Sequence, residues 1–259
     1  MNARIYVCAH KPENTLLKLT DPMYIPIHCG KAIFKESERT GYLPELGDNT
    51  GDNISEKNPY YCELTGMYWA WKNDDSEPDD IIGLNHYRRY FNEPDSGGMK
   101  LITKEAIENI LNSYDFIVSG PSTDNQYDYV KPGEDTAYEN YKECHHQESM
   151  DYVLTGAKRM FSKIAGRFEY EVKHSGAMCL CNLFITKKKY FDEYSKFLFP
   201  ILFFVETKII ETKKSLNQYL REFGYLSERL FRPWLIATGH SGKQIGEVNW
   251  EDYSGYIWR

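Results

Sequence analysis

The chain has 259 residues, of which 41% are hydrophobic and 27% charged, so it is long enough to bury a core and is neither disordered nor collagen-like. A formal net charge of −7 argues against a protein that grips nucleic acid through a basic surface. Aromatic residues make up 15% of the chain, which suits walls around planar or polyhydroxylated ligands as well as a core.

Strand-like and helix-like segments alternate along the chain. Short apolar runs bounded by turn formers predict strands at residues 5–9, 81–84, 116–118 and 178–185, the last interrupted by Asn182. Helical spacing predicts helices at residues 58–73, 104–111, 150–164, 190–223 and 227–237. Residues 47–55 and 122–146 are polar with little periodicity and are expected to be loops.

Two helices carry local signals at defined positions. Asn58 can cap the helix at 58–73, and Pro59 suits its first turn. Residues 190–223 are expected to form one or two helices, with Pro200 at a kink or a start, and the helix at 227–237 contains Pro233.

This alternation predicts an α/β fold of Rossmann-like type, with a mostly parallel sheet, helices on both faces and a single domain over residues 1–259. In such folds ligands sit where the carboxyl ends of the strands open into loops. The groups expected to converge there are His10 and Lys11, the loop from Asp48 to Asn58, and residues 85–89.

The apolar runs predict no membrane-spanning helix, because the longest, residues 197–205, is far shorter than the ~20 residues needed. Met1 leads almost directly into the first strand, without the apolar stretch of a signal peptide, so a cytoplasmic location is expected. The lysines at 187–189 fit a charged helix start; the alternative is a peripheral contact with the inner face of the membrane.

The six cysteines lack C-x-x-C spacing and are expected to be reduced thiols packed as small hydrophobes. Cys179 and Cys181 alternate along the strand predicted at 178–185, which would place them on one face. A metal site at these two cysteines is disfavoured, because the sequence has no second pair of soft ligands at the spacing of a metal site.

Several well-known catalytic motifs are absent from the sequence. Neither G-x-x-x-x-G-K-[ST] nor G-x-G-x-x-G follows a strand, which disfavours nucleoside triphosphate cleavage and dinucleotide redox chemistry. The chain also lacks G-x-S-x-G and H-E-x-x-H, so it carries none of the motifs that usually indicate a hydrolase.

Four segments together resemble a bacterial family long labelled as a domain of unknown function: residues 52–58, residues 63–73 (Glu-Leu-Thr, then Tyr-Trp-Ala-Trp-Lys-Asn), residues 83–91 (Gly-Leu-Asn-His-Tyr-Arg-Arg-Tyr-Phe) and residues 224–230 (Gly-Tyr-Leu-Ser-Glu-Arg-Leu). Members of that family occur in capsule and exopolysaccharide gene clusters, and some are galactofuranosyltransferases. The resemblance extends from residue 5 to about residue 235.

The resemblance implies a glycosyltransferase of GT-A type that takes a hexose, galactofuranose above all, from a UDP donor to a growing surface polysaccharide. It also implies inversion at the transferred carbon. The first half, residues 1–120, would bind the nucleotide sugar and residues 121–259 the acceptor. The partners expected are therefore a UDP-sugar and an oligosaccharide or lipid-linked glycan, and nucleic acid is not among them.

Sugar transfer from UDP needs positive charge on the departing diphosphate. GT-A enzymes mostly use an Asp-x-Asp and a divalent metal, and residues 85–89 occupy that topological place here. Arg88 and Arg89 can donate bidentate hydrogen bonds to phosphate and replace the metal. Alternatively, His86 ligates Mn or Mg together with Asp48 or Asp52. Without the resemblance, a solvated turn beside a core histidine also fits these residues.

Donor binding is expected from a set of polar groups near the strand ends: His10, Lys11, Asp52, Asn53, Ser55, Lys57, Asn58, Glu63, Asn85, His86 and Tyr87. Ordinary turn formation, helix capping and an exposed lysine are the alternatives for several of them. Glu63 is expected at the ribose or the donor sugar.

The general base that deprotonates the acceptor hydroxyl is expected to be Glu228, preferred over Asp151 and Glu206 because it stands in one of the resembling segments near a helix start. An ion pair with Arg229 or Arg232 is the alternative role of Glu228. For the acceptor, the expected contacts are Asn182, His145 and His146; the two histidines fit a surface position equally well.

Two other functions remain open at this level. One is a catalytically silent carbohydrate-binding or assembly protein on a transferase fold. The other is a metal-dependent phosphotransferase, which the lack of a carboxylate cluster at a strand end weakens.

Overall fold

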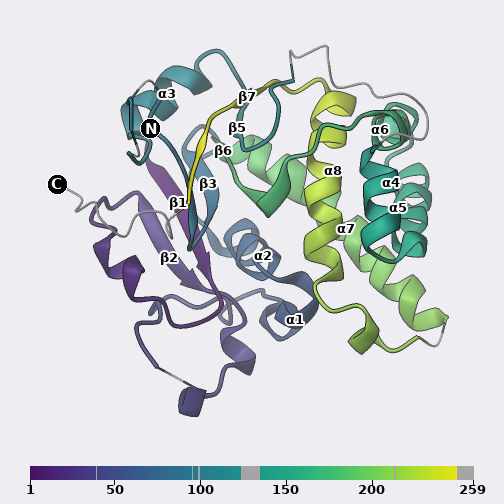
Figure 1. The fold of residues 1–259 in the computed structure, drawn as a ribbon, viewed down its shortest axis with the longest axis horizontal. Helices are drawn as coiled ribbons and strands as arrows, with labels where there is room; N and C mark the ends of the chain where they lie inside the picture. The colour runs from purple at the N-terminus through teal and green to yellow at the C-terminus, as the bar shows by residue number, and fades with distance from the viewer. Residues whose placement is uncertain (39, 95, 99, 124–134, 213, 250–259) are drawn as a thin grey trace.

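A computed structural model describes residues 1–249, apart from residues 39, 95, 99, 124–134 and 213. The described residues form a mixed α/β fold with an eight-stranded sheet (Figure 1). Its strands are β1 (Ala3–Ala9), β2 (Tyr24–His28), β3 (Ile81–His86), β4 (Arg89–Phe91), β5 (Phe116–Val118), β6 (Phe184–Lys187), β7 (Gly242–Gln244) and β8 (Glu247–Asn249).

Six strands follow the order β2-β1-β3-β6-β5-β7, and β4 and β8 extend from β3. β1 is parallel to β2 and β3, and β7 is parallel to β5, whereas β6 is antiparallel to both of its neighbours. The predicted α/β fold with a mostly parallel sheet is therefore confirmed. The reversal of β6 was not predicted, because strand direction depends on where the chain re-enters the sheet and not on the local apolar pattern.

Eight α-helices occur in the described residues: α1 (Asn58–Tyr61), α2 (Leu64–Asn73), α3 (Lys104–Leu111), α4 (Ala137–Cys144), α5 (Gln147–Met160), α6 (Ser162–His174), α7 (Lys188–Glu211) and α8 (Glu222–Thr238). Short 3-10 helices lie at Asn14–Lys18, Lys31–Ile33, Glu36–Glu38, Ser55–Lys57, Leu180–Asn182 and Leu216–Gln218. Within those residues, no helix is long and apolar enough to cross a bilayer.

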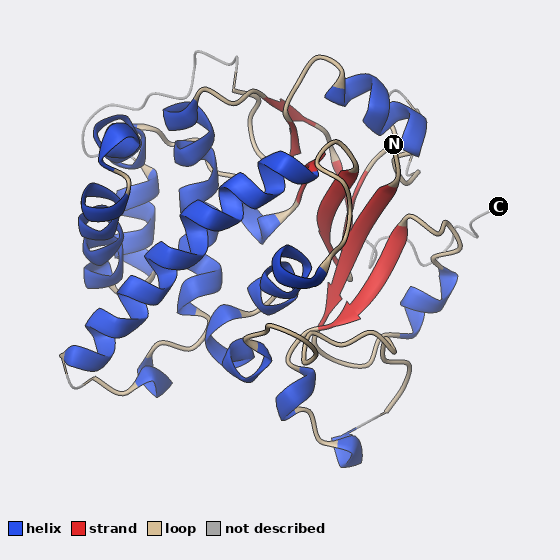
Figure 2. Cartoon of the chain, turned by 180° about the vertical axis from the view of Figure 1, so that it is seen from behind, coloured by secondary structure: helices blue, strands red, loops and turns tan. Residues whose placement is uncertain are grey.

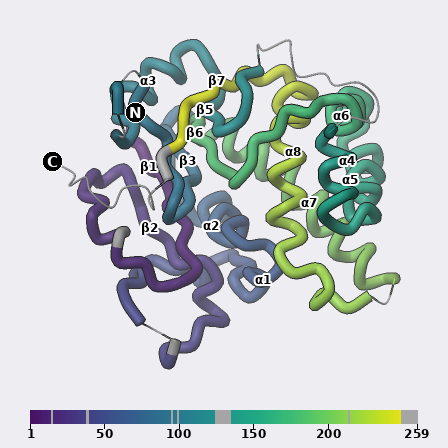
Figure 3. Tube along the Cα trace, in the orientation of Figure 1, coloured from purple at the N-terminus to yellow at the C-terminus, as the bar shows by residue number. Residues whose placement is uncertain are grey.

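Helices cover both faces of the sheet, but unequally. α3 packs on one face, while α2 and α7 pack on the other, and α4, α5 and α6 form a further layer beyond α8 (Figures 1 and 2). After α8 the chain returns to the sheet as β7, beside β5 (Figure 3).

β1 is apolar from Ile5 to Ala9 because both of its faces are buried there. Tyr6 and Cys8 belong to the large cluster under α2, α7 and α8, and Ile5 and Val7 belong to the smaller cluster under α3. A strand that is covered on two sides has no polar face, which explains its continuous apolar sequence.

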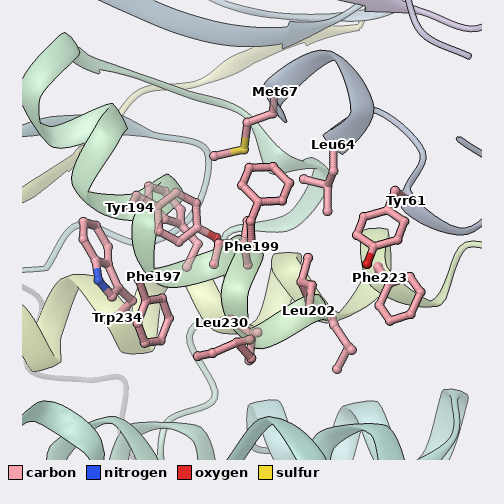
Figure 4. Packing of buried hydrophobic residues seen from close by; sticks show 14 of the residues in the cluster. Tyr61, Leu64, Met67, Tyr194, Phe197, Phe199, Leu202, Phe223, Leu230 and Trp234 are labelled. Carbon is pink, nitrogen blue, oxygen red and sulfur yellow. The ribbon is translucent and has the colours of Figure 1, made fainter. Parts of the chain in front are cut away.

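Aromatic side chains fill the large cluster between the sheet and the helices (Figure 4). The Trp234 ring lies 4.9 Å from that of Tyr194, and Tyr61 stacks on Phe223 at 4.4 Å between ring centroids. The second pair joins α1 to the first turn of α8, which fixes the start of α8 beside the loops at the carboxyl ends of β1 and β3.

The helix predicted over residues 58–73 is broken. Cys62 has a positive φ (52°) and separates α1 from α2. Asn58 does not cap α1: its amide Nδ2 donates to the carbonyl of Cys62 at 2.8 Å and to Oγ1 of Thr65 at 3.1 Å. Asn58 therefore stabilises the break, and that break displaces Glu63 from a regular helix.

The strand predicted at residues 178–185 is also wrong in its first half. Residues Leu180–Asn182 form a 3-10 helix in which Cys181 (φ 69°) and Asn182 (φ 51°) are left-handed, and β6 begins only at Phe184. Cys179 and Cys181 consequently do not alternate along a strand, and Asn182 precedes the sheet instead of interrupting it.

Other boundaries differ as well. Part of the loop predicted at 122–146 is α4, and residues 124–134 lie outside the described residues. α8 begins at Glu222, ahead of the predicted residue 227, and β7 and β8 were not predicted. Pro200 and Pro233 lie inside α7 and α8.

All six cysteines are free thiols. Cys8, Cys29 and Cys179 are buried as expected, but Cys144 is exposed because it ends α4 on its outer side.

Candidate active site

A pocket of about 400 Å³ opens at the carboxyl ends of β1 and β3. We call it the sheet-edge pocket. Its lining residues are Cys8, His10, Lys11, Cys29, Asn58, Pro59, Cys62, Glu63, His86, Tyr87, Arg88 and Arg221.

Two of the three segments predicted to converge do so in this pocket, and of the third, the loop from Asp48 to Asn58, only Asn58 lines it. Cys8 is paired with His86 across parallel β1 and β3, so the residues that follow both strands leave the sheet together. Residues 58–63, which include α1, close the pocket on another side. The carboxyl edge of the parallel strands thus positions the pocket, as the fold class predicts.

The Tyr87 ring is the centre around which the polar groups gather. Only 1% of Tyr87 is exposed. His86 and His10 contact its ring at 4.4 and 5.6 Å between centroids. Lys11 Nζ and the Arg88 guanidinium lie 5.6 and 5.1 Å from its centroid. Cations over an aromatic face are attracted to the ring, so Tyr87 holds both charges at the pocket wall.

Arg221 was not predicted. It has a left-handed backbone (φ 62°) directly before α8, and its N–H donates to the carbonyl of Pro59 at 2.9 Å. Its guanidinium lies 4.9 Å from the centroid of the Tyr225 ring. No motif marks this arginine, because only the packing of α8 against α1 brings it to the pocket.

The pocket carries a positive excess in a chain whose net charge is −7. Lys11, Arg88 and Arg221 face a single lining carboxylate, Glu63. Clefts lined by one sign of charge focus the field on ligands of the opposite sign. The sheet-edge pocket is therefore suited to an anion.

The two histidines add hydrogen-bonding capacity instead of charge. Burial, together with His10 and Arg88, lowers the pKa of His86 to about 3. The pKa of His10 is also lowered, by partial burial and by Lys11, Arg221 and Arg88. Both rings are therefore mainly neutral at pH 7, and each can donate one hydrogen bond and accept another.

Glu63 is held by a chain of hydrogen bonds that reaches α8. Asn182 Nδ2 donates to Glu63 Oε1 at 2.6 Å, and Ser227 Oγ donates to Asn182 Oδ1 at 2.6 Å. Burial raises the pKa of the Glu63 carboxyl, and the bond from Asn182 opposes that rise. Asn182 thus supports a pocket residue from beneath.

Glu228 lies in α8, behind the lining residues. Its Oε1 accepts from the Cys181 N–H at 2.8 Å and its Oε2 from Arg229 at 2.7 Å. Burial raises its pKa, while Arg229 and Arg221 oppose the rise. The ion pair with Arg229, which the sequence suggested as the alternative role of Glu228, is present, and 16% of the Glu228 side chain is exposed.

Two residues of the segment 85–89 do not line the pocket. Asn85 is 1% exposed, and because side chains alternate along β3 it faces away from His86. Its amide atoms have no hydrogen-bond partner among the described residues. Arg89 begins β4; partial burial raises the pKa of Glu247, and the charge of Arg89 opposes that rise.

Most polar groups of the loop before α1 hold the loop itself. Buried Asp48 accepts from the N–H groups of Gly30 and Lys31 at 2.8 and 3.1 Å, and from Ser55 Oγ at 2.5 Å. Asn53 Oδ1 accepts from the Ser55 N–H at 3.1 Å.

The remaining loop residues are paired outside the pocket. Asp52 accepts from the Tyr68 hydroxyl at 3.1 Å. Lys57 forms an ion pair with Glu206 at 2.6 Å, and the Tyr61 hydroxyl donates to the same carboxylate at 3.0 Å. Glu206 is thus occupied away from the lining residues.

The acceptor-side residues lie near α8. His145 stacks on Tyr225 at 4.3 Å between centroids, and Tyr225 also contacts Arg221, so His145 is next to the border of the pocket. His146 Nδ1 lies 3.0 Å from Glu222 Oε2. Asp151, on α5, accepts from the Tyr138 hydroxyl at 2.8 Å.

A metal at His86 would need carboxylates beside its ring. Asp48 and Asp52 are engaged as described above, and neither lines the pocket. In the part of the chain that the structure describes, no group of three or more His, Cys, Asp and Glu side chains is placed to hold a metal ion. These side chains therefore do not form a ligand set around His86.

Residues 4–239 match the family described as a domain of unknown function, DUF4422, and the chain belongs to this family. No curated protein matches the sequence. The fold is similar to a solved apo structure described as the bifunctional glycosyltransferase WbbM, with a TM-score of 0.74 and 26% identity over 96% of this chain and 45% of that one. The chain thus spans less than half the length of that protein. The family-level resemblance seen in the motifs is confirmed.

Proposed function

We propose that this chain is a glycosyltransferase that moves a hexose from a UDP donor to a glycan hydroxyl, with the donor in the sheet-edge pocket. The observation that carries the proposal is the set of three permanent cations, Lys11, Arg88 and Arg221, at the carboxyl edge of the strands. The likeness to a bifunctional glycosyltransferase over nearly the whole chain supports the same class of reaction.

The cations suit the leaving group of such a transfer. Negative charge builds up on the departing diphosphate, and fixed donors aimed at it lower the barrier most. Arg88 and Arg221 can each offer a planar fork to phosphate oxygens, and Lys11 adds a point charge. We propose that these side chains take the place of a divalent metal on the diphosphate. Arg89, at the start of β4, does not line the pocket, and we propose that its positive charge stabilises the diphosphate from there.

The two halves of the chain contribute differently to this proposal. Of the lining residues, Arg221 alone comes from the part after residue 120. Residues 1–120 are proposed to bind the nucleotide sugar, and the later part, with His145, His146 and Tyr225 at the border, the acceptor. Glu228 is proposed as the base, because a buried carboxylate with a raised pKa accepts a hydroxyl proton more readily at neutral pH.

The finer identity of the substrates is proposed from the resemblance of the motifs. The donor would be UDP-galactofuranose and the acceptor a growing capsular or exopolysaccharide chain, with inversion in a single displacement.

Calorimetric titration tests the proposal. UDP, UDP-galactofuranose, UDP-galactopyranose and UDP-glucose are each titrated with and without manganese. The proposal expects binding of UDP and of at least one UDP-sugar without the metal. Absence of UDP binding under both conditions would contradict it, and binding only with manganese would contradict the role given to the cations.

A transfer assay then separates an enzyme from a binding protein. Glu228→Gln keeps the size of the side chain and removes the base. An enzyme is expected to keep donor binding and to lose turnover at least 100-fold. A wild-type protein that binds the donor but transfers nothing to any glycan offered would instead be a carbohydrate-binding or assembly protein.

A further inference from the structure

Glu63 is the only carboxylate among the described residues that line the sheet-edge pocket. The other charged residues that line the pocket are the cations Lys11, Arg88 and Arg221, which suit phosphate oxygens. A carboxylate, by contrast, repels a phosphate and cannot donate a hydrogen bond to it. The presence of a buried carboxylate in an anion pocket calls for a ligand atom of another kind.

The hydrogen bonds around Glu63 have a fixed direction. An ionised carboxylate only accepts, so Asn182 must turn its Nδ2 toward Glu63 and its Oδ1 toward Ser227. Ser227 then donates to Asn182, and Asn182 donates to Glu63. The donors of the relay are used by Glu63, by Asn182 and by the Gly224 carbonyl, which Ser227 Oγ also contacts at 2.8 Å, so none is left for the ligand.

The backbone around the relay is specialised to hold it. Asn182 is left-handed at φ 51°, a conformation that asparagine tolerates better than most residues, and it is 5% exposed. Its Nδ2 also lies 3.3 Å from the carbonyl of Gly224 on α8. Glu63 follows Cys62, whose positive φ breaks the helix at this point. The Asn182 backbone and its bond to Gly224 thus hold the amide at Oε1 of Glu63, and no bond of this relay reaches Oε2.

We propose that Glu63, oriented by Asn182 and Ser227, recognises the hydroxyl groups of the donor sugar and so determines that a neutral, polyhydroxylated group is carried on the diphosphate. This assignment rests on the proposed function. A sugar hydroxyl donates to Glu63, while the diphosphate accepts from Arg88, Arg221 and Lys11. The pocket would thus separate into a part that donates hydrogen bonds and a part that accepts them, matching the two chemical parts of a nucleotide sugar.

The affinity difference between UDP and a UDP-sugar measures the contact directly, without turnover. The dissociation constants of UDP and of the tightest UDP-sugar from the titration series are compared in the wild type and in Glu63→Gln. A hydrogen bond to a charged group is worth about 10- to 100-fold in affinity. We expect Glu63→Gln to reduce the affinity for the UDP-sugar at least about tenfold and to change the affinity for UDP less than twofold.

Two further variants keep the test decisive. Asn182→Gly preserves the left-handed backbone and removes the amide that orients Glu63. It is therefore expected to reduce the affinity for the UDP-sugar several-fold and to leave the affinity for UDP unchanged. Glu56→Gln removes an exposed carboxylate next to the loop that closes the pocket and is expected to change neither constant. If the thermal transition shows that Glu63→Gln does not fold, the affinities of Asn182→Gly for UDP and the UDP-sugar test the assignment in its place.

Each outcome has a separate meaning. Equal weakening of UDP and UDP-sugar would place Glu63 at the ribose and overturn the assignment, and so would an unchanged UDP-sugar affinity in both variants. In either case the proposed function would stand, because UDP still binds the wild type. A wild type that binds neither ligand would overturn the proposed function and this assignment with it.

Discussion

Two pockets in the described part of the chain are nearly equal in size and differ in the chemistry of their walls. The sheet-edge pocket measures about 400 Å³, and a second pocket of about 420 Å³ lies between the ends of α5, α6, α7 and α8. We call the second the helical pocket; its lining residues are Met160, Phe161, Ser162, Lys163, Ile164, Glu193, Lys196, Phe197, Trp234 and Thr238.

The difference between them comes from the elements that form the walls. Strand ends, the residues that follow them and the residues around α1 line the sheet-edge pocket, and residues beyond a strand end are free to be polar because they need not pack a core. Helix faces line the helical pocket, and Phe197 and Trp234 there belong to the large apolar cluster. Size does not distinguish the two, whereas the origin of the lining residues does. The predictions below test that contrast in order of decreasing expected effect.

Trp234→Ala is expected to lower the free energy of unfolding by about 3–5 kcal/mol, because the ring is 1% exposed and packs against Tyr194. The affinity of the folded variant for UDP is expected to stay within twofold of the wild type. Urea unfolding and calorimetry measure the two quantities. A large loss of UDP affinity in the folded variant would show that the two pockets are coupled.

Arg221→Asn is expected to reduce the affinity for UDP about 10- to 100-fold, because a charged donor to the diphosphate is lost. Asparagine tolerates the left-handed backbone at φ 62°, so the start of α8 is retained. Lys196→Ala, which removes a cation from the helical pocket, is the matched control and should leave the affinity unchanged. Equal effects of the two variants would remove the contrast between the pockets.

His86 is expected to make stability depend on pH. Its folded-state pKa of about 3 lies below the unfolded value of 6.5, so the unfolded state binds more protons between those values. The free energy of unfolding should therefore fall as pH drops below about 6.5, by about 2 kcal/mol from pH 7 to pH 5. In His86→Gln this part of the dependence should vanish. Urea unfolding at both pH values checks it, and an unchanged slope in the variant would refute the assignment.

Lys11→Ala is expected to have the smallest effect, about two- to fivefold on the dissociation constant of UDP, because Lys11 is exposed and its charge is screened. The loss should shrink further as salt is raised from 50 to about 200 mM, conditions under which the contribution of buried groups changes less. An effect larger than that of Arg221→Asn would indicate that the diphosphate lies nearer to the end of β1.

The sequence by itself determined the parts of the molecule whose signals are local. Periodicity and β-branching identified the strands at β1, β3 and β5, and Thr103 marked the start of α3, where its side chain accepts from the Ala106 N–H at 3.3 Å. Because parallel strands end at one edge, the sequence also placed His10, Lys11 and the residues after β3 at one site.

Only the tertiary structure decided which distant residues complete that site. Arg221 and the relay from Ser227 through Asn182 to Glu63 carry no periodic signal, because they depend on α8 packing against α1 and against the 3-10 helix at Leu180–Asn182. The bond between Asn182 and Glu63 joins residues 119 positions apart. Apolar patterns determine which side of an element is buried, but the partner across such a distance is fixed only by how the elements pack.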